Sequence, residues 1–428
     1  MKVLMFGWEF PPHISGGLGT ASFGLTRGLS TISGLEITFV VPRAYGDEDQ
    51  SKFRVVGAAD VSVDSKHMRF SKILKSISYI EVNSNIVPYH SPEEYDSLVN
   101  EASSRKQRLI HTTPGGKLIF SGGYGKNLFD EIASYALVAG QIADNHPHDV
   151  IHAHDWLTYP AGMAAKSVSG KPLVIHVHAT DFDRSGGKVN PAVFEIEKRG
   201  MEAADRIIAV SNLTRNTIIE KYGIDESKVF TVYNAVEPLG DQEKIALRRG
   251  IDDKVVTFLG RITLQKGPEY FVQAAEKVLR KMENVRFVMA GSGELLERMI
   301  NWAASLGIVD RFHFTGFLKG DDVFRMFSIS DVYVMPSVSE PFGISPLEAM
   351  QSNVPTIISN QSGVAEILKY AIKTDFWDVD AMADAIYGLL NYPSLAETFI
   401  KYGKEEVDNM KWENSARKVY EIYKDAVM

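Results

Sequence analysis

The sequence predicts an α/β protein made of two doubly wound, Rossmann-like domains. Short apolar runs that are typical of buried parallel strands alternate with longer amphipathic runs that are typical of helices. This alternation stops at a polar segment, residues 238–253, which contains Pro238 and Gly240, and it begins again after that segment. The length of 428 residues also favours more than one domain.

The composition limits the classes of partner and chemistry. Apolar residues make up 45% of the chain, which is enough for sizeable cores, and the formal net charge of −8 argues against a general binder of nucleic acid or anionic membranes. The chain has no cysteine, which excludes disulfides, thiolate zinc sites and a cysteine nucleophile. No apolar run approaches the length of a membrane span, and the first residues resemble a strand more than a signal peptide. We therefore expect a cytoplasmic protein.

The first βαβ unit is expected at residues 3–41, with a glycine-rich turn before its helix. Gly16 and Gly17 in this turn would let backbone N–H groups approach an anion at the helix start. The dinucleotide fingerprint is not met, because nine residues separate Phe6 from Gly16. The alternative is a tight turn that needs glycine for its conformation.

The rest of the first domain supplies further expected elements. We expect weak strands at 77–82 and 118–120, a charged helix or loop at 91–107, helices at 128–142 and 195–203, and strands at 149–154, 172–178, 205–211 and 229–233.

Two His-x-His pairs fall at the ends of neighbouring predicted strands. His152 and His154 alternate onto one face of the first strand, and His176 and His178 onto one face of the next. Such pairs would suit a metal hydrolase, but that site needs further ligands, so we expect no metal. The acidic triplet at residues 181–183 could hold a metal-bound diphosphate, and is more simply a loop whose aspartates cap a helix.

The second domain opens with a candidate anion site. A buried strand is expected at residues 255–259 and a helix at 269–280, with Pro268 as its first residue. Arg261 and Lys266 flank this helix start at the carboxyl end of the strand, where N–H groups and the helix dipole favour an anion. The alternative is two ordinary solvated charges. Later strands are expected at 284–290, 309–314, 331–335 and 354–358, and helices at 379–390 and 412–427.

The segment at residues 336–350 organises this domain. Glu340 and Glu348 both lie beyond the carboxyl end of a predicted strand, where ligands of open α/β sheets bind. Ser345 and Glu348 could form a capping box with Pro346 at the first helical position. A capping box does not account for Glu340, whose carboxylate would suit a polyhydroxyl ligand because it accepts paired hydrogen bonds from vicinal hydroxyls.

The sequence Glu340-Pro341-Phe342-Gly343, followed by Glu348, resembles the paired-glutamate motif of retaining glycosyltransferases of the GT-B fold. That group includes the glycogen and starch synthases. The resemblance implies two Rossmann-like domains facing a central cleft. It also implies that the first glutamate meets hydroxyls of the donor sugar and that the second holds the ribose of the nucleotide. Further donor contacts are expected from backbone-exposing residues, namely Gly16, Gly17, Gly291, Gly293, Phe342, Gly343 and Ile344.

Other motifs extend the resemblance along the chain. Residues 152–156 resemble a loop of glycogen synthases, and His178 matches a histidine whose backbone carbonyl and ring line the transferred sugar. Arg261 and Lys266 match the Arg-x4-Lys-Gly motif that binds the donor diphosphate. Ile14 stands where glycogen synthases carry a lysine, which moves the chain towards the wider family. The acceptor and sugar side is expected to include His154, Asp155, Trp156 and Asp181.

The implied reaction moves a glucosyl unit from ADP- or UDP-glucose to an α-glucan, with retention of configuration and without a cofactor or metal. Arg261 and Lys266 would stabilise the leaving group, while Glu340 and His178 would hold the sugar. The expected parts are an acceptor domain (1–237), a linker (238–253), a donor domain (254–410) and a helix that crosses back (411–428). The alternatives are transfer of another nucleotide hexose to a different glycan or small acceptor, a metal-dependent hydrolase, and a non-catalytic glycan-binding protein. The resemblance leaves the base, hexose, acceptor and oligomeric state open.

Overall fold

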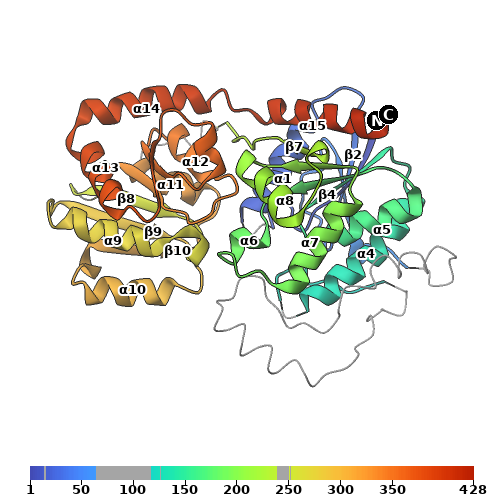
Figure 1. Ribbon diagram of the computed structural model, residues 1–428, viewed down its shortest axis with the longest axis horizontal. Coiled ribbons are helices and arrows are strands. Elements are labelled where there is room, and N and C mark those ends of the chain that lie inside the picture. The colour runs from blue at the N-terminus through green and yellow to red at the C-terminus, as the bar shows by residue number, and fades with distance from the viewer. Residues whose placement is uncertain (14–15, 64–116, 126, 239–249, 251) are drawn as a thin grey trace, which may run out of the picture. The chain divides into compact units, whose positions relative to one another are not determined.

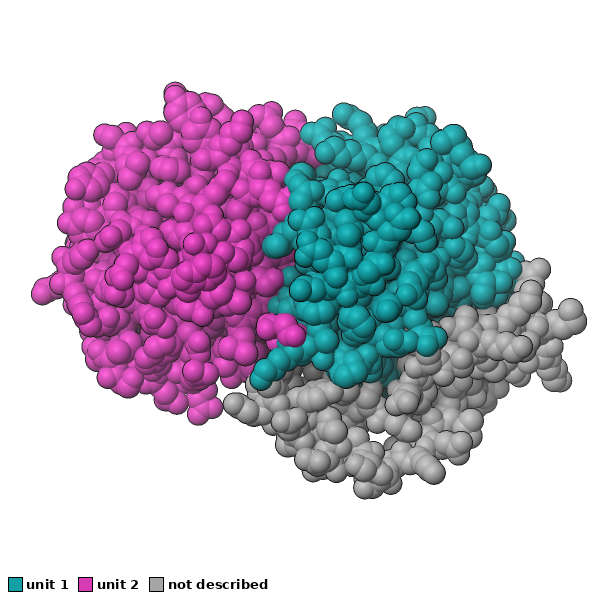
Figure 2. Space-filling model, in the orientation of Figure 1, with its two compact units in different colours: residues 1–184, 188–234, 412–428 teal, residues 185–187, 235–411 magenta. Residues whose placement is uncertain are grey.

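The computed structural model describes the chain except residues 14–15, 64–116, 126, 239–249 and 251 (Figure 1). The described residues form two compact units (Figure 2). Unit 1 comprises Met1–Arg184, Lys188–Asn234 and Trp412–Met428, and unit 2 comprises Ser185–Gly187 and Ala235–Lys411. The predicted linker at 238–253 lies largely outside the described residues, as do Ile14, the predicted strand at 77–82 and the charged segment at 91–107.

Unit 1 is built on a seven-stranded parallel sheet. The strand order is β3-β2-β1-β4-β5-β6-β7, so the order reverses between β1 and β4. The strands are buried and rich in Val and Ile, as expected for a parallel sheet covered on both faces. Their bounds are β1 (Lys2–Phe6), β2 (Glu36–Val41), β3 (Arg54–Gly57), β4 (Val150–His154), β5 (Leu173–Val177), β6 (Arg206–Ala209) and β7 (Val229–Thr231).

The helices of unit 1 pack in groups against this sheet. Helix α5 packs against α4 and α7, and α1 packs against α15. Ser211 caps α8, since its hydroxyl accepts a hydrogen bond from the Thr214 N–H at 3.0 Å. The helices are α1 (Gly17–Leu29), α4 (Leu128–Asn145), α5 (Tyr159–Ser169), α6 (Asp181–Arg184), α7 (Pro191–Ala203), α8 (Asn212–Tyr222) and α15 (Trp412–Val427).

Helix α15 is part of unit 1 although it follows unit 2 in the sequence. It lies against α1, where a Cβ atom on Gly24 would come within 2.3 Å of the Trp412 ring and one on Gly28 within 2.7 Å of the Trp412 carbonyl oxygen. The Ser415 hydroxyl donates to the Tyr233 carbonyl at 2.7 Å. Two helical glycines therefore make room for the first residue of the returning helix.

Unit 2 is built on a six-stranded parallel sheet with the order β10-β9-β8-β11-β12-β13. The order reverses between β8 and β11. The strands are β8 (Lys254–Leu259), β9 (Val285–Ala290), β10 (Phe312–Gly316), β11 (Val332–Met335), β12 (Thr356–Ser359) and β13 (Ile372–Thr374). The helices are α9 (Pro268–Leu279), α10 (Leu296–Ser305), α11 (Asp321–Ile329), α12 (Ser345–Gln351), α13 (Val379–Asn391) and α14 (Pro393–Val407), and short 3-10 turns include η4 (Leu264–Lys266).

The prediction of two doubly wound parallel sheets is confirmed. Two local predictions are wrong. Residues 118–120 do not form a strand: isolated bridging takes its place, and Lys117 pairs with Ser62. The capping box at α12 does not form, because Ser345 already lies in the helix and no side chain caps the helix start. Among the described helices, none is long and apolar enough to cross a membrane.

Candidate active site

Five strand-end loops of unit 2 meet where the strand order reverses. In open α/β sheets, ligands bind at this place. Backbone hydrogen bonds of 2.9–3.0 Å join the loops after β8, β9, β10, β11 and β12. These bonds are Gly260 N to Ala290 O, Ile262 N to Ser292 O, Gly291 N to Gly316 O, Val338 N to Gln265 O and Glu340 N to Gln361 O.

Gly291 and Gly293 allow the loop after β9 to pack against the loop after β8. Both have positive φ angles, 142° and 158°. A Cβ atom on Gly291 would lie 1.8 Å from the Gly260 carbonyl oxygen, and one on Gly293 would lie 2.4 Å from that of Ile262. The close approach that requires glycine here is therefore between two protein loops. The expected approach of this backbone to a donor stays a prediction.

Lys266 and Glu340 form an ion pair. The Lys266 Nζ atom bonds the Glu340 Oε2 atom, and the Ser337 hydroxyl donates to the same oxygen at 3.3 Å. Glu340 is only 6% exposed, so its carboxylate needs such a partner. Arg261 lies half-buried in the same β8 loop as Lys266. The strand order thus brings together Lys266 and Glu340, although the sequence analysis expected the first at the diphosphate and the second at the sugar of a ligand.

Glu348 does not cap α12, which was the alternative role considered for it in the sequence analysis. It lies in the first turn of α12, and its carboxyl group has no hydrogen-bond or ion-pair partner in the part of the chain that the structure describes. Burial raises the pKa of Glu348 to about 7. The Ser345 side chain instead hydrogen-bonds Tyr333 on β11.

Tyr333 shows that the two glutamates lie in one region. Its hydroxyl donates to the Leu259 carbonyl at the end of β8, at 3.4 Å. Burial raises the pKa of Tyr333, and the nearby charges of Glu340 and Glu348 raise it further. The structure therefore gathers Lys266, Glu340 and Glu348 around the ends of β8 and β11.

The residues between the two glutamates serve the loop itself. Phe342 is buried, and its carbonyl accepts a hydrogen bond from the Val364 N–H at 2.8 Å. Gly343 has φ 99°, and Ile344 occupies the N-cap position of α12. Their expected contacts with a donor stay predictions.

Gly17 in unit 1 differs from the glycines of unit 2. It is the first residue of α1, and a Cβ atom built there would meet no described atom within 4 Å. Its backbone φ is not in the left-handed region, and the φ of Gly16, 179°, is extended backbone open to any residue. Conformational strain therefore does not account for the glycine pair, which weakens the tight-turn interpretation.

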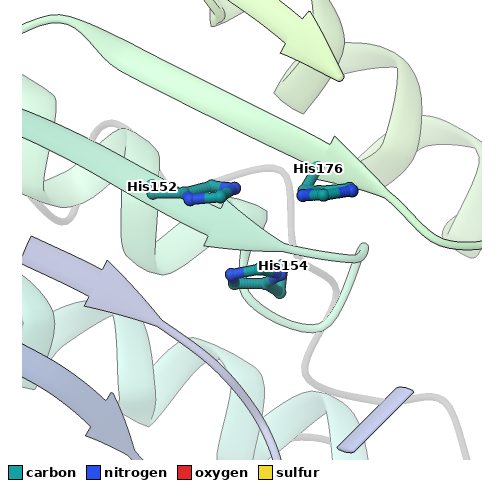
Figure 3. A group of neighbouring side chains, drawn as sticks. All are labelled: His152, His154 and His176. Carbon is teal, nitrogen blue, oxygen red and sulfur yellow. The ribbon is translucent and has the colours of Figure 1, made fainter. Parts of the chain in front are cut away.

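The two His-x-His pairs form a buried histidine stack, which comprises His152, His154, His176 and His178. Figure 3 shows the first three, which come from β4 and β5 and are fully buried. Burial lowers the pKa of all four histidines, that of His178 to about 3, so the rings are neutral. One ring nitrogen of each of His152, His154 and His176 lies within 4.8 Å of the other two, which is close enough for all three to bind one metal ion.

The orientation of the rings does not suit a metal centre. The His152 and His154 rings are tilted by 31° with centroids 4.2 Å apart, and each of them stacks on the His176 ring, with planes 9° and 22° apart. Imidazole lone pairs lie in the ring plane, so the two rings do not aim at a common point. Two of the rings use one nitrogen internally: His152 Nδ1 bonds the Tyr423 hydroxyl at 2.5 Å, and His154 Nδ1 bonds His178 Nε2 at 2.9 Å. We therefore describe the group as packed neutral rings.

The His178 ring faces the interior. Its Nε2 atom bonds His154, and its Nδ1 atom is buried without a partner among the described residues. The ring nitrogens are therefore turned away from solvent, although the residue as a whole is half-buried.

Asp155, Trp156 and Asp181 are also buried inside unit 1, with His154. Trp156 lies in the hydrophobic core, with the Arg184 guanidinium 5.9 Å from its ring centroid. Asp155 has φ 64°, which is unusual for a residue with a side chain, and burial raises its pKa to about 6. Direct contact of these side chains with an acceptor stays a prediction.

Sequence reasoning missed Arg184 and Glu197. The Arg184 side chain is 4% exposed and forms ion pairs with Glu197, with Asp155 at 3.6 Å and with Asp181 at 3.8 Å. Glu197 lies on the buried face of α7, which also carries Val193, Ile196, Gly200 and Met201. A glutamate on an otherwise apolar helical stripe was the available signal. We call Arg184, Asp155, Asp181 and Glu197 the Arg184 network.

Comparison with known families identifies the chain. Residues 15–238 match the family described as Glycosyltransferase Family 4, and residues 241–406 match the family described as Glycosyl transferases group 1. The chain is a group 1 glycosyltransferase. This membership agrees with the resemblance carried by the paired glutamates.

Two of the following three relatives align with nearly the whole of this glycosyltransferase. It is 28% identical to an uncharacterised glycosyltransferase of Methanocaldococcus jannaschii, over 100% of this chain and 99% of that protein. It is 23% identical to a glycogen synthase of Mycobacterium tuberculosis, over 99% and 94% of the two chains. It is 27% identical to a D-inositol 3-phosphate glycosyltransferase of Rhodococcus opacus, over 68% and 72%.

Solved structures confirm the predicted GT-B fold. A sucrose-phosphate synthase from Thermosynechococcus elongatus matches with a TM-score of 0.71 at 17% identity, over 99% of this chain and 98% of that chain. HepE of Anabaena in complex with UDP-glucose matches with a TM-score of 0.65 at 15% identity, over 99% and 100%.

Proposed function

We propose that this glycosyltransferase transfers a glucosyl unit from ADP- or UDP-glucose to an α-glucan, with retention of configuration at the anomeric carbon. The observation that carries the proposal is the grouping of Lys266, Glu340 and Glu348 at the strand-order reversal of unit 2. A cation, a buried carboxylate and an uncommitted carboxyl group are the partners that a diphosphate, a sugar and a ribose require.

Each group has a role in the proposed reaction. The bond between the anomeric carbon and the diphosphate oxygen breaks, the acceptor hydroxyl oxygen bonds to the same face of that carbon, and its proton passes to the departing phosphate oxygen. Arg261 and Lys266 stabilise the negative charge on the leaving diphosphate. Glu340 accepts hydrogen bonds from sugar hydroxyls, and Glu348 from ribose hydroxyls. The two cations supply the charge that a metal would otherwise supply.

The Lys266–Glu340 pair suggests how donor binding is made selective. A diphosphate that takes Lys266 removes the partner of a carboxylate that is 6% exposed. An unpaired buried carboxylate is costly, and sugar hydroxyls are the groups that can replace the lysine. Diphosphate and sugar binding would therefore depend on each other, and a free nucleoside diphosphate would bind less favourably than the nucleotide sugar.

The relatives support this donor and acceptor class. A glycogen synthase aligns over nearly the whole chain, and HepE was solved with UDP-glucose. A second candidate is transfer to a small polyol phosphate, which the D-inositol 3-phosphate glycosyltransferases favour by their slightly higher identity over a shorter alignment. A cytoplasmic location and independence of metal are part of the same proposal.

The first test is a screen of nucleotide sugars with an α-glucan and with inositol phosphate as acceptors. We expect transfer to the glucan from a nucleotide glucose, an α-configured product by NMR, and activity that survives a strong chelator. Lys266→Ala should lower turnover about a hundredfold or more. Lys277→Ala is the matched control, since Lys277 pairs with an exposed aspartate, Asp380. Near-normal turnover of Lys266→Ala, or no transfer from any nucleotide sugar, would refute the proposal.

A further inference from the structure

The strands β4 and β5 of unit 1 present different side chains to the two faces of the sheet. Ile151, Ala153 and Ile175 belong to the apolar core that α4 and α5 share. The alternate residues of the same strands form the histidine stack, which lies on the face where α15 packs, since the Tyr423 ring of α15 contacts His152 (Figure 3). The two strands are therefore apolar under α4 and α5 and lined by imidazoles under α15.

The histidine stack leaves buried ring nitrogens without partners among the described residues. His152 Nδ1 bonds the Tyr423 hydroxyl, while His152 Nε2 has no partner. Both ring nitrogens of His176 are unpaired. A neutral imidazole always carries one N–H donor, so His176 buries a donor that has no acceptor in the described structure, which is costly. Apolar side chains of similar size would therefore stabilise this face better.

The environment of the stack opposes any positive charge on it. Burial lowers the pKa of His152, His154 and His176 most, and the neighbouring rings of the stack lower it further. Tyr423 faces the stack from α15, and burial raises its pKa well above the ordinary value, so its hydroxyl stays neutral. A proton that entered the stack would therefore meet only neutral rings and a neutral hydroxyl group.

The other elements around the stack supply no opposite charge from the described residues. Met5 on β1, Phe39 on β2 and Ile208 on β6 lie next to its rings, and none of them titrates. The remaining charged groups of the neighbouring elements are exposed or already paired: Arg27 of α1 is exposed, Lys424 pairs with Glu421, Asp425 pairs with Arg206, and Asp155 accepts the N–H groups of residues 178–179 and pairs with Arg184.

Helix α15 is tied to the rest of unit 1 by polar contacts of different kinds. The Ser415 hydroxyl donates to a backbone carbonyl after β7 at 2.7 Å, and Asp425 pairs with Arg206 at 2.6 Å. A third contact joins the Tyr423 hydroxyl to His152. Of these three contacts, only the third contains a group whose charge ordinarily changes between pH 5 and 8. Proton uptake by His152 would therefore act directly on the docking of α15.

We propose that the histidine stack makes α15 an acid-released latch, in which proton uptake by His152 raises the fraction of molecules whose α15 is undocked from the rest of unit 1. A charged His152 ring can still donate to the Tyr423 hydroxyl, but its charge stays buried without an opposite charge. Undocking of α15 lets the ring reach water. The other face of β4 and β5 stays covered by α4 and α5, so the opening is local. The proposal goes beyond the proposed function and does not depend on it.

The size of the effect follows from proton linkage. A histidine that is neutral under α15, and that has its ordinary pKa of about 6.5 when uncovered, binds a proton only in the undocked state. Because the pKa in the docked state is lowered, docking weakens as pH falls through the ordinary value. One such histidine raises the ratio of undocked to docked molecules about tenfold between pH 7.5 and 5.5, and two raise it about a hundredfold. The slope therefore counts the histidines that α15 keeps neutral.

Hydrogen exchange of the full-length protein at a series of pH values from 7.5 to 5.5 measures this ratio. After correction for the intrinsic exchange rate at each pH, protection of the α15 peptide should fall about tenfold or more. Protection of the α14 peptide should change less than twofold, since α14 lies in unit 2 and covers no histidine of the stack. At each pH the α15 peptide should be less protected than the α4 peptide, because α15 opens without unfolding of the sheet.

Matched variants separate the proton from the hydrogen bond. His152→Asn keeps a polar partner for the Tyr423 hydroxyl and takes up no proton in this range, so its α15 protection should fall about tenfold less than that of the wild type. Tyr423→Phe keeps all four histidines and loses only the hydroxyl group, so α15 should be less protected at every pH with an unchanged slope. His313→Asn alters an exposed histidine of β10 in unit 2 and should change neither quantity.

Three results would overturn the inference. The first is a change of less than twofold in wild-type α15 protection, a measurement that needs no variant to fold. The second is equal protection of α15 and α4 at every pH, which would show that acid unfolds unit 1 as a whole. The third is a wild-type slope in His152→Asn, which would contradict the role of His152. None of these measurements uses sugar transfer, so failure of the proposed function would leave them unchanged.

Discussion

The two units place charged side chains at the same topological position and use them differently. In unit 2 the strand-end loops are joined backbone to backbone, and the charged groups Lys266 and Glu348 keep part of their surface exposed. In unit 1 the charged groups are buried and hold the backbone themselves, as Asp155 does for His178 and Ala179. At one edge charged side chains thus keep exposed surface, while at the other edge buried charged side chains hold the backbone in place. The comparison teaches that a charged residue at the carboxyl edge of a parallel sheet can be bound up in holding the backbone of that edge.

The largest expected change in stability is at Gly291 in unit 2. Gly291→Ala would place a Cβ atom 1.8 Å from the Gly260 carbonyl at φ 142°, so the loops would have to separate. We expect a loss of about 3 kcal/mol or more, from overpacking and backbone strain together. Denaturant unfolding measures it. Gly388→Ala is the control, since its nearest side-chain atom lies at 3.7 Å and alanine favours the helix. Equal stability of the two variants would show that the unit 2 loops are not held by backbone contact.

Removal of Lys266 should also lower stability, because it leaves Glu340 buried and unpaired. We expect Lys266→Ala to cost about 3 kcal/mol at neutral pH, and Glu340→Gln to cost less, because Lys266 is the more exposed partner. A double-mutant cycle by denaturant unfolding gives the coupling. Additive effects of the two substitutions would contradict a buried pair in unit 2.

The pH dependence of stability should have opposite signs for the histidine stack of unit 1 and for the buried carboxyl group of Glu348 in unit 2, and unit 1 also holds two carboxyl groups of the second kind. The histidine stack has lowered pKa values in the folded state, so the unfolded chain binds more protons below pH 6.5, and stability falls as pH falls through that value. Each histidine contributes about 1 kcal/mol between pH 6.5 and 5.5. Burial raises the pKa of Glu348, and also those of Asp155 and Glu197. The stability of the protein should therefore fall as pH rises from the pKa values of these groups in the unfolded chain towards their folded values of about 6 to 8.

His176→Leu isolates one member of the stack. Both ring nitrogens of His176 lack a partner in the described structure, so its replacement by an apolar side chain should be neutral or stabilising at pH 7. Between pH 6.5 and 5.5 the free energy of unfolding should fall by about 1 kcal/mol less in this variant than in the wild type, as measured by thermal unfolding. Glu348→Gln in unit 2 should have the opposite effect on the slope. A strong loss of stability in His176→Leu at pH 7 would instead indicate that the stack binds an ion.

The smallest expected change is at Gly17 in unit 1. Gly17→Ala meets no described atom within 4 Å, so stability should change by less than about 0.5 kcal/mol. If its backbone approaches the donor, transfer should nevertheless slow, with a higher KM for the nucleotide sugar. Unchanged kinetics would leave this loop without a role in binding.

The sequence predicted those features that follow from strand order and glycine chemistry. The proximity of Lys266 and Glu340 follows from placing two loops at one carboxyl edge. Their ion pair could not be foreseen, because it depends on which rotamers fill the gap before a ligand is bound. The prediction of a capping box was wrong because Ser345 lies inside α12 and its side chain hydrogen-bonds Tyr333, which lies on the strand β11. The roles of Arg184 and Glu197 were missed because their partners lie on separate elements of unit 1.

The docking of Trp412 over Gly24 and Gly28 has a practical consequence for dissecting the enzyme. A fragment that stops at Asn234 would leave an uncovered furrow along α1 and remove the Tyr423 hydroxyl from His152. Such a fragment should aggregate or fold poorly unless a peptide corresponding to α15 is added in trans or fused by circular permutation. Unit 1 is therefore a discontinuous assembly whose closing segment follows all of unit 2 in the sequence.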